Sequence, residues 1–398
     1  MAKQWEEKQV SLGGAIITGV ITLVVGFFIG TGWNKIAPNI LPYLGINSHS
    51  TVSNDWSALD EVYNTLAANF DGELDKNTLI EGAKKGLVAA AGDRYTAYMD
   101  AEEAKEYEAE LHGDVGSGIG IEMGLRDGYV RVLRTLPDNP AGKAGVQAGD
   151  IIYKVDGEEV YAESTETIAS KLRGANGTKV KLTVVRDGTE KEFTLTREPI
   201  NNVSVYVTYD GDTAIVTISR FDTDTGTKLQ KIVNDEFKSK NIQKVILDLR
   251  GNGGGYVSAA QDVLSLWING DVILNQSSKG KTTPTYAKRN QAVLANMPTV
   301  VLVNGTTASA SEIVAGALKD YNKATILGET TYGKGVVQTL INLSGSTLLK
   351  VTTASWYTPK GTSINQEGIK PDVEVTLTYD DANNNRDPQL DAAKKLSL

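Results

Sequence analysis

The chain of 398 residues contains no cysteine and only two histidines, His49 and His112. The absence of cysteine excludes disulfides, thiolate nucleophiles and cysteine-based zinc sites. A mechanism with a histidine base has only these two candidates, and both lie far upstream of the motifs found after residue 240. A net charge of −9 lacks the basic character of nucleic-acid-binding proteins, so we expect no nucleic-acid partner.

One long apolar run is present, near the N-terminus. No charged residue occurs from residue 9 to residue 34, and a helix needs roughly 20 apolar residues to cross a bilayer. Two lysines precede the run and one follows closely, which favours a cytoplasmic N-terminus. We expect residues 1–34 to be a cytoplasmic stub and a single-pass transmembrane anchor in the cell membrane, with an extracytoplasmic body behind it. A cleaved signal peptide and a buried core helix fit less well.

The rest of the chain divides by composition into five parts. Residues 35–53 hold two prolines and many small polar residues, which is typical of a linker. Apolar residues recur at helical intervals over 54–112, and short β-rich runs separated by Asp-Gly pairs fill 113–199. Strands alternate with helices over 200–378, and 379–398 is expected to be a loosely packed tail before a short helix. The predicted fold class is multidomain, α/β plus mainly β.

The segment GETTYGKGVVQ, residues 328–338, places a lysine in a glycine-rich turn. It resembles a phosphate-binding P-loop, but Gly335 stands where a serine or threonine would hold magnesium. The following VVQTLINL predicts a strand, whereas a P-loop leads into a helix whose N-terminus faces phosphate. Nucleotide binding therefore fails on two counts, and Lys334 needs another role.

Two other motifs could supply catalytic groups. VILDLRGNGGG is a strand that ends in glycines, whose N–H groups either form half of an oxyanion hole or serve only a tight turn. NGTTASASEIVAGALKDY places Ser309 at a helix start. This serine is either the first residue of a capping box with Glu312, or a nucleophile whose neighbour Ala310 donates its N–H to an oxyanion.

A serine nucleophile needs a base, and Lys334 can be that base if burial keeps its amine neutral. An unperturbed lysine has a pKa near 10.4, and desolvation can lower it by up to about 3–5 units. Serine–lysine pairs are an accepted variant of the hydrolytic triad. Gln338, four residues on, shares a face with Lys334 and could orient the amine without adding a charge.

The β-rich part resembles a PDZ domain over residues 113–199. Taken alone, GDVGSGIGIEM is either a glycine-relieved strand or a loop that captures a terminal carboxylate. NPAGKAGVQAGDIIYKVDGEEV and the TETIASKLRG helix complete the resemblance to the PDZ family. It assigns carboxylate binding to Gly118, Ile119, Gly120 and Ile121. Arg173, at the helix end, is a candidate for coupling ligand binding to the rest of the protein, although the motif is also common as a simple helix end.

The whole combination resembles the C-terminal processing peptidases, also called tail-specific proteases, over residues 55–377. The resemblance rests on DLRGNGGG, TASASEI, GETTYGKGVVQ and TPKGTSINQEGIKPDVEV. It implies a ClpP/crotonase-like α/β protease core and a serine endopeptidase that uses no metal or cofactor. The implied substrates are proteins with apolar C-termini, which the PDZ domain recognises as a gate.

The resemblance also assigns roles to individual residues. The nucleophile is Ser309, the base is Lys334 and the supporting amide is Gln338, while Ser311 is structural. The oxyanion donors are the N–H groups of Ala310 and of a glycine in the run 253–255, with Gly254 and Gly255 as the candidates. Relatives often form dimers through the region that corresponds to 54–112, so a homo-oligomer is expected.

Two other functions compete with this interpretation. A catalytically inactive PDZ receptor for exported protein tails could retain a peptidase-like core, but it would be free to lose any of the three catalytic residues. An esterase with a Ser-His-Asp triad lacks the G-x-S-x-G elbow and the histidines it needs.

Overall fold

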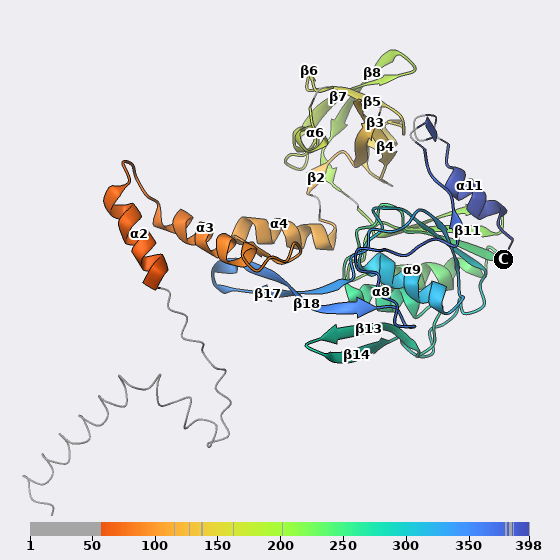
Figure 1. The fold of residues 1–398 in the computed structure, drawn as a ribbon. Helices are drawn as coiled ribbons and strands as arrows, with labels where there is room; N and C mark the ends of the chain where they lie inside the picture. Colours follow the sequence, from red (N-terminus) through yellow and green to blue (C-terminus); the bar gives the residue numbers. More distant parts are fainter. Residues whose placement is uncertain are drawn as a thin grey trace, which may run out of the picture. The chain divides into compact units, whose positions relative to one another are not determined.

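A computed structural model describes residues 57–398, apart from residues 115, 127, 137, 162, 201, 379, 382, 383, 385 and 398 (Figure 1). The predicted transmembrane anchor and linker lie outside the described residues. Within the described part of the chain, no helix combines the length and the apolar character needed to cross a membrane. The described residues belong to two compact units, which divide between residues 79 and 80.

The helical region predicted over 54–112 is confirmed. It contains α2 (Ser57–Asn69), α3 (Lys76–Ala89) and α4 (Ala101–His112). No residue of α2 is buried, although its apolar residues recur at helical spacing. The exposed large apolar side chains of this helix and the following residue are Leu59, Val62, Tyr63, Leu66 and Phe70.

The PDZ-like part has its own sheet and its own core. Its strands run in the order β3-β4-β5-β7-β8, and α6 (Thr165–Leu172) packs against β3 and β5. The strands are β3 (Ile121–Arg126), β4 (Tyr129–Thr135), β5 (Ile151–Val155), β7 (Lys179–Arg186) and β8 (Thr189–Thr196), with β6 (Glu158–Glu159) beside β5 and a short α5 (Pro140–Lys143). The two ends of the module pair as β2 (Ser117–Gly118) and β9 (Glu198–Pro199), so the chain enters and leaves at one place.

The α/β part is built on a six-stranded sheet in the order β10-β11-β12-β15-β16-β19. Only the β10–β11 pair is antiparallel, and the strands are β10 (Val205–Asp210), β11 (Thr213–Ile218), β12 (Lys244–Asp248), β15 (Thr299–Val303), β16 (Thr325–Gly328) and β19 (Val373–Glu374). Ligand sites in parallel sheets lie at the carboxyl ends of the strands. The glycine, serine and lysine motifs follow β12, β15 and β16, so all three reach the same edge.

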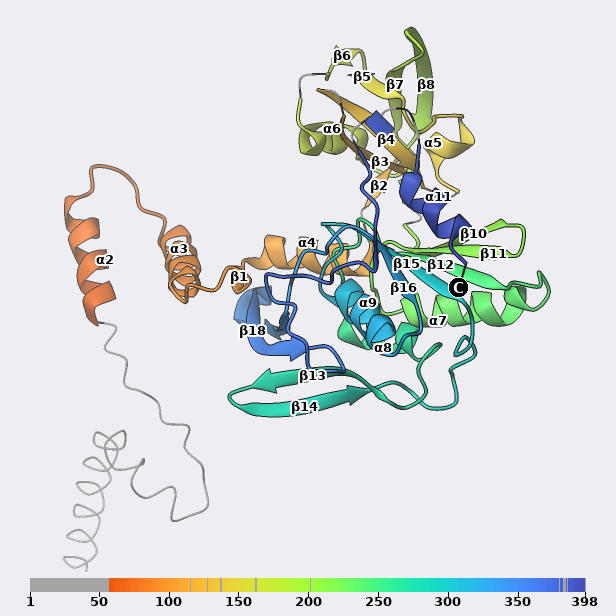
Figure 2. The same ribbon diagram turned by 45° about the vertical axis from the view of Figure 1, so that its right-hand side comes forward.

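Helices cover both faces of this sheet because apolar side chains alternate along its strands. Leu247 and Val301 pack in the core formed with α7 (Thr225–Ile232), α8 (Val257–Leu264) and α9 (Ala310–Asp320). The π-helical turn η2 (Val233–Phe237) continues α7. Ile246 and Val300 face the other side and pack with Ala393 of α11 (Pro388–Lys395). Figure 2 shows α11 beside β15 and β16.

The terminal helix corrects one prediction. The segment up to Leu390 was expected to be loosely packed, but Asp387 caps α11 and Leu390 packs against the sheet. Asp387 also forms an ion pair with Arg250 at 2.8 Å, and Lys244 Nζ donates hydrogen bonds to three carbonyl groups at the end of the helix. Two basic side chains from distant parts of the sequence therefore hold this helix at both ends.

A second sheet extends from the α/β part. Its strands are β1 (Ala97–Met99), β18 (Leu348–Tyr357), β13 (Val272–Ser278) and β14 (Lys281–Tyr286), with β17 (Val336–Asn342) paired to β18 and a short turn η3 (Ser344–Ser346) between them. The strand predicted after Lys334 is confirmed as β17. Since β1 pairs with β18, the segment between α3 and α4 is joined to the sheet that carries Gln338.

Candidate active site

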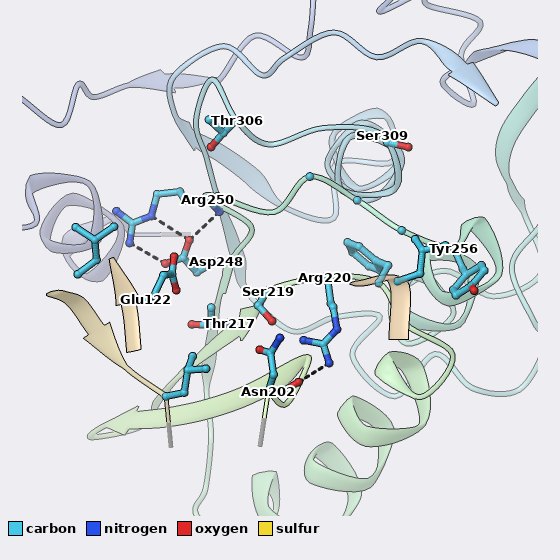
Figure 3. A pocket seen from close by; sticks show the side chains of 18 of the residues that line it. Glu122, Asn202, Thr217, Ser219, Arg220, Asp248, Arg250, Tyr256, Thr306 and Ser309 are labelled. Carbon is cyan, nitrogen blue, oxygen red and sulfur yellow. Dashed lines mark hydrogen bonds and ion pairs between the residues drawn. The ribbon is translucent and has the colours of Figure 1, made fainter. Parts of the chain in front are cut away.

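Ser309 lies between β15 and α9 in a conformation that serine rarely adopts. Its φ of 57° and ψ of −117° differ from the extended conformation of an ordinary N-cap residue. Figure 3 shows Ser309 at the end of α9, above the loop that leads from Arg250 to Tyr256. Ser311, by contrast, is fully buried and donates a hydrogen bond to the carbonyl of Asn252 at 3.0 Å. Ser309 therefore lines a large cleft, whereas the hydroxyl of Ser311 holds the glycine-rich loop in place.

The glycine-rich loop is held against Ser309 by the buried side chain of Asn252. This side chain donates to the carbonyl of Ile218 and accepts from Gly254 N–H, each at 2.8 Å. The N–H of Gly254 is therefore already engaged. The N–H groups of Gly255 and Ala310 have no acceptor within the described residues, which leaves these two of the three predicted oxyanion donors available.

The geometry of the glycine-rich loop predicts that alanine substitutions at the neighbouring residues Gly253 and Gly254 will have very different effects on activity. A Cβ on Gly254, whose φ is 106°, would stand 2.8 Å from Ser309 Cβ, whereas a Cβ on Gly253 would meet no atom within 4 Å. We expect Gly254→Ala to lower kcat on a peptide substrate by about 10²-fold, because the added methyl group would displace Ser309 and a shift of about 1 Å in a reacting group can cost this much. Gly253→Ala is the matched control and should stay within about twofold. Equal losses in both variants would contradict this.

Lys334 lies in the loop between β16 and β17 with its amine half-buried. Its Nζ donates to Gln338 Oε1 at 2.8 Å, and its carbonyl accepts from Trp356 Nε1 at 2.9 Å. Burial lowers the pKa of Lys334, and the nearby charge of Lys350 lowers it further, while Glu312 and Asp93 oppose the change. Desolvation of this kind favours the neutral amine, which is the form a general base requires.

Glu312 joins the serine to the lysine loop, although sequence analysis considered it only for a capping role. Its carboxylate is fully buried, and Oε2 accepts from Ser309 N at 2.8 Å and from Lys334 N at 2.9 Å. The other oxygen accepts from Gly333 N at 2.7 Å and from the Thr331 hydroxyl at 2.6 Å. Four hydrogen bonds compensate the buried charge. Since one oxygen binds both backbones, Ser309 and Lys334 are neighbours.

Neither a serine–lysine nor a serine–histidine hydrogen bond is formed in this conformation. Within the described residues the Lys334 amine bonds to Gln338 and not to the Ser309 hydroxyl. The ring of His112 lies 6.2 Å from that of Tyr256, and no hydrogen bond joins His112 to Ser309. Over the same residues, no group of three His, Asp or Glu side chains is placed to hold a metal ion.

The loop predicted to bind a carboxylate and the predicted catalytic residues line one cleft of about 1440 Å³. Within the described residues, the N–H groups of Ile119 and Gly120 have no acceptor. Arg173 ends α6, lies exposed and also lines the cleft. The predicted residues found in this one cleft are Gly118, Ile119, Gly120, Ile121, Arg173, Gly254, Gly255, Ser309, Lys334 and Gln338.

Known proteins share this arrangement along most of the chain. Family models match at residues 28–103 (activating protease CtpB N-terminal domain), 131–186 (PDZ domain) and 212–375 (peptidase family S41). A probable CtpA-like serine protease of Staphylococcus aureus (strain COL) is 34% identical over 375 residues, which cover 94% of this chain and 73% of that protein. The chain belongs to peptidase family S41. It is a serine peptidase with a PDZ domain, and the predicted family is confirmed.

Solved structures of S41 peptidases have the same fold. A photosystem II D1 C-terminal processing protease is 28% identical with a TM-score of 0.52, over 81% of this chain and 87% of that one. A putative S41 protease from Bacteroides fragilis NCTC 9343 has a TM-score of 0.53 at 16% identity, over 77% of this chain and 86% of that one. The second likeness concerns the fold alone.

Proposed function

We propose that this S41 peptidase is a membrane-anchored endopeptidase that recognises protein C-terminal tails and cleaves with a Ser309–Lys334 dyad supported by Gln338. The observation that carries the proposal is that Glu312 Oε2 accepts hydrogen bonds from the backbone N–H groups of both Ser309 and Lys334, and that these two residues line one cleft. The half-buried amine with its lowered pKa supports the choice of base.

The proposed chemistry follows from the donors and acceptors in the cleft. A neutral Lys334 amine donates one hydrogen to Gln338 Oε1, which leaves its lone pair free to take the proton of Ser309. The serine oxygen attacks the scissile carbonyl, and the resulting oxyanion accepts hydrogen bonds from the N–H groups of Gly255 and Ala310. Lys334 then gives this proton to the leaving amine. In the second half of the reaction, water attacks the acyl group while Lys334 takes its proton, and Lys334 returns that proton to the Ser309 oxygen as the acyl group leaves.

The proposed substrates are proteins with apolar C-termini. The cleft beside the carboxylate loop is lined by apolar side chains of β3, β4 and α6, which suit an apolar terminal residue: Ile121, Met123, Leu133, Ala169 and Leu172. A tail would add as a strand and place its carboxylate on the free N–H groups. The likeness to a protease named for C-terminal processing supports the same class of substrate.

The test is cleavage of an unstructured protein with an apolar C-terminus by the full chain in detergent. Wild type, Ser309→Ala and Lys334→Ala are compared on the free and the amidated tail. Cutting by wild type alone, weakened by amidation, is expected. Cutting that survives Ser309→Ala would refute the nucleophile. Tail binding without cutting by any version would favour the second candidate, an inactive PDZ receptor.

Arg173 is proposed to couple tail binding to the catalytic core, because it is exposed at the end of α6 and lines the shared cleft. Within the described residues no ion pair is formed by its side chain, whereas Lys171 at the same helix end pairs with Glu158 and Glu163. We expect Arg173→Ala to reduce the stimulation of turnover by added tail peptide about threefold while Kd for the peptide stays unchanged, which corresponds to a coupling free energy of about 0.7 kcal/mol. Unchanged stimulation would remove Arg173 from the mechanism.

A homo-oligomer, in its simplest form a dimer, is proposed to form through the apolar side of α2. This helix buries none of its own residues, and Leu59 and Val62 are 52% and 64% exposed. An exposed apolar stripe of this kind marks an interaction surface. We expect Leu59→Asp with Val62→Asp to convert the protein to monomers in light scattering, while Asp60→Asn on the same helix leaves its mass unchanged. A monomeric wild type would contradict the proposal.

The anchor is proposed from the uncharged run over residues 9–34 and the lysines that precede it. It would hold the peptidase on the outer side of the cell membrane, with the N-terminus in the cytoplasm. Resistance to alkaline extraction, together with digestion of the body by protease added outside the cell, would support this. Release of the protein by alkali would refute the anchor.

A further inference from the structure

The surroundings of the Lys334 amine include a residue that no motif pointed to. Tyr95 lies just before β1, in the segment of the helical region between α3 and α4. It is half-buried, and its ring centroid lies 5.3 Å from Lys334 Nζ. Its carbonyl oxygen accepts a hydrogen bond from Gln338 Nε2. Tyr95 thus touches both the base and its supporting amide.

The carbonyl contact fixes which way the Gln338 amide faces. A backbone carbonyl oxygen can only accept, so the amide must turn its NH₂ group toward Tyr95. Its oxygen then faces Lys334, where it accepts from the amine at 2.8 Å. With the amide reversed, two acceptors would meet at Tyr95, and the NH₂ group would compete with Ser309 for the lone pair of the neutral Lys334 amine. The orientation that the proposed mechanism needs is therefore set by Tyr95.

The position of Tyr95 is itself fixed by its neighbours. Asp93 accepts from Tyr95 N at 3.3 Å, and Thr352 N of β18 donates to the Thr96 hydroxyl at 3.1 Å. The guanidinium of Arg94 lies 4.5 Å from the Tyr95 ring centroid and donates to its hydroxyl. Both the carbonyl and the ring are thereby held at the active site by the segment before β1.

We propose that Tyr95 is a positioning residue of the active site, whose carbonyl orients Gln338 and whose ring covers the amine of Lys334. The helical region would then contribute to catalysis as well as to assembly, because residues 93–99 lie within it, between α3 and α4. The inference rests on the proposed function, since it assumes that Lys334 is the base.

The ring acts on the lysine in two opposite ways. As a cover it keeps water from the amine and favours the neutral form, whereas its π-face attracts the ammonium form, an effect worth about 0.5–1 kcal/mol at an exposed site. The charged groups facing the amine are Lys350 from β18, Glu312 from α9 and Asp93, with Arg94 on the ring of Tyr95. Burial is the largest influence on the pKa of Lys334, so the covering effect should prevail.

The experiment measures the pH profile of kcat/KM for the full chain in detergent on one peptide substrate. Activity should rise with pH as Lys334 loses its proton. In Tyr95→Leu we expect this rise to move up by about one pH unit, with about a tenfold loss at neutral pH that alkaline pH restores. Tyr95→Phe keeps the ring and is expected to rescue the position of the rise. The change in kcat/KM should come from kcat, while KM stays nearly constant.

Tyr98→Leu is the matched control, because Tyr98 lies on the same segment and its ring is 5.3 Å from another lysine, Lys84. Tyr98→Phe replaces it if the leucine variant does not fold. A profile shifted as far in the control, an equal loss in Tyr95→Leu at every pH, or no shift at all would overturn the inference. If kcat/KM of Lys334→Ala still rises with pH in the same way, the proposed base is wrong. If the rise is lost in Lys334→Ala but is unshifted in Tyr95→Leu, only the role of Tyr95 is refuted.

Discussion

Replacing Ser309 by alanine is expected to lower kcat for peptide-bond cleavage by at least about 10⁴-fold, because the hydroxyl proposed to form the acyl intermediate is lost. Lys334→Ala should cost about 10²–10⁴-fold, the usual contribution of a general base. Neither change should prevent folding, since Ser309 and the Lys334 amine are only partly buried. Cleavage of a fluorogenic peptide, with thermal unfolding measured in parallel, tests both variants.

Ser311→Ala is the matched control for the serine. Its hydroxyl also belongs to the start of α9, but it is fully buried and donates to the carbonyl of Asn252. Losing this hydrogen bond should cost about 1 kcal/mol of stability and leave a fully functional nucleophile in place. The two serines would have been assigned the wrong way round if Ser311→Ala were inactive and Ser309→Ala active.

Glu312→Ala is expected to damage activity and stability together. Four donors, the N–H groups of Ser309, Gly333 and Lys334 and the Thr331 hydroxyl, would lose their acceptor inside the protein. Each buried donor left without a partner costs about 1–3 kcal/mol. We expect a fall in melting temperature and a loss in kcat of at least about 10²-fold, because the nucleophile and the base are no longer held to one anchor.

Glu312→Gln should be milder. A glutamine has one acceptor oxygen, which can still serve Ser309 and Lys334, while its NH₂ group then faces Gly333 N–H and the Thr331 hydroxyl. The hydroxyl can turn to accept, but Gly333 N–H cannot. We expect about a tenfold loss in kcat, equivalent to one such defect of about 1.4 kcal/mol.

Glu329→Gln controls for the lost charge in this experiment. Glu329 lies in the same loop, and within the described residues its side chain makes no hydrogen bond to Ser309 or Lys334. Activity should stay within about twofold. An intact Glu312→Ala enzyme, or a Glu329→Gln enzyme as impaired as Glu312→Gln, would contradict the anchoring role.

The sequence predicted the parts of the site that depend on local pattern. VILDLR was predicted as a strand, whereas β16, which precedes Lys334, was not; the motifs lie together because the carboxyl ends of parallel strands meet at one edge. Gln338 was found by its spacing of four residues from Lys334, although Lys334 lies in the loop before β17 and not on the strand itself.

The remainder depends on contacts between distant positions, which leave no local pattern. Tyr95 and Gln338 are 243 residues apart, and nothing in the sequence around either residue marks the pair. Glu312 was noticed as a cap, but its bonds to the lysine loop span 22 residues and an intervening strand. Asn252 carried a hint, as the one polar side chain among glycines, yet its partner Ile218 lies on another strand. The β13–β14 hairpin was missed because polar residues interrupt its alternation.

The pairing of β2 with β9 has a consequence for how such enzymes can diversify. The PDZ module enters and leaves through two adjacent strands, so its removal would leave two chain ends that a short loop could join. Domains whose termini lie close together can be inserted into a host fold without disturbing its core. Here the strands of the protease sheet all follow this junction. The module proposed to bind substrate tails can therefore be exchanged for another while the peptidase core is inherited intact.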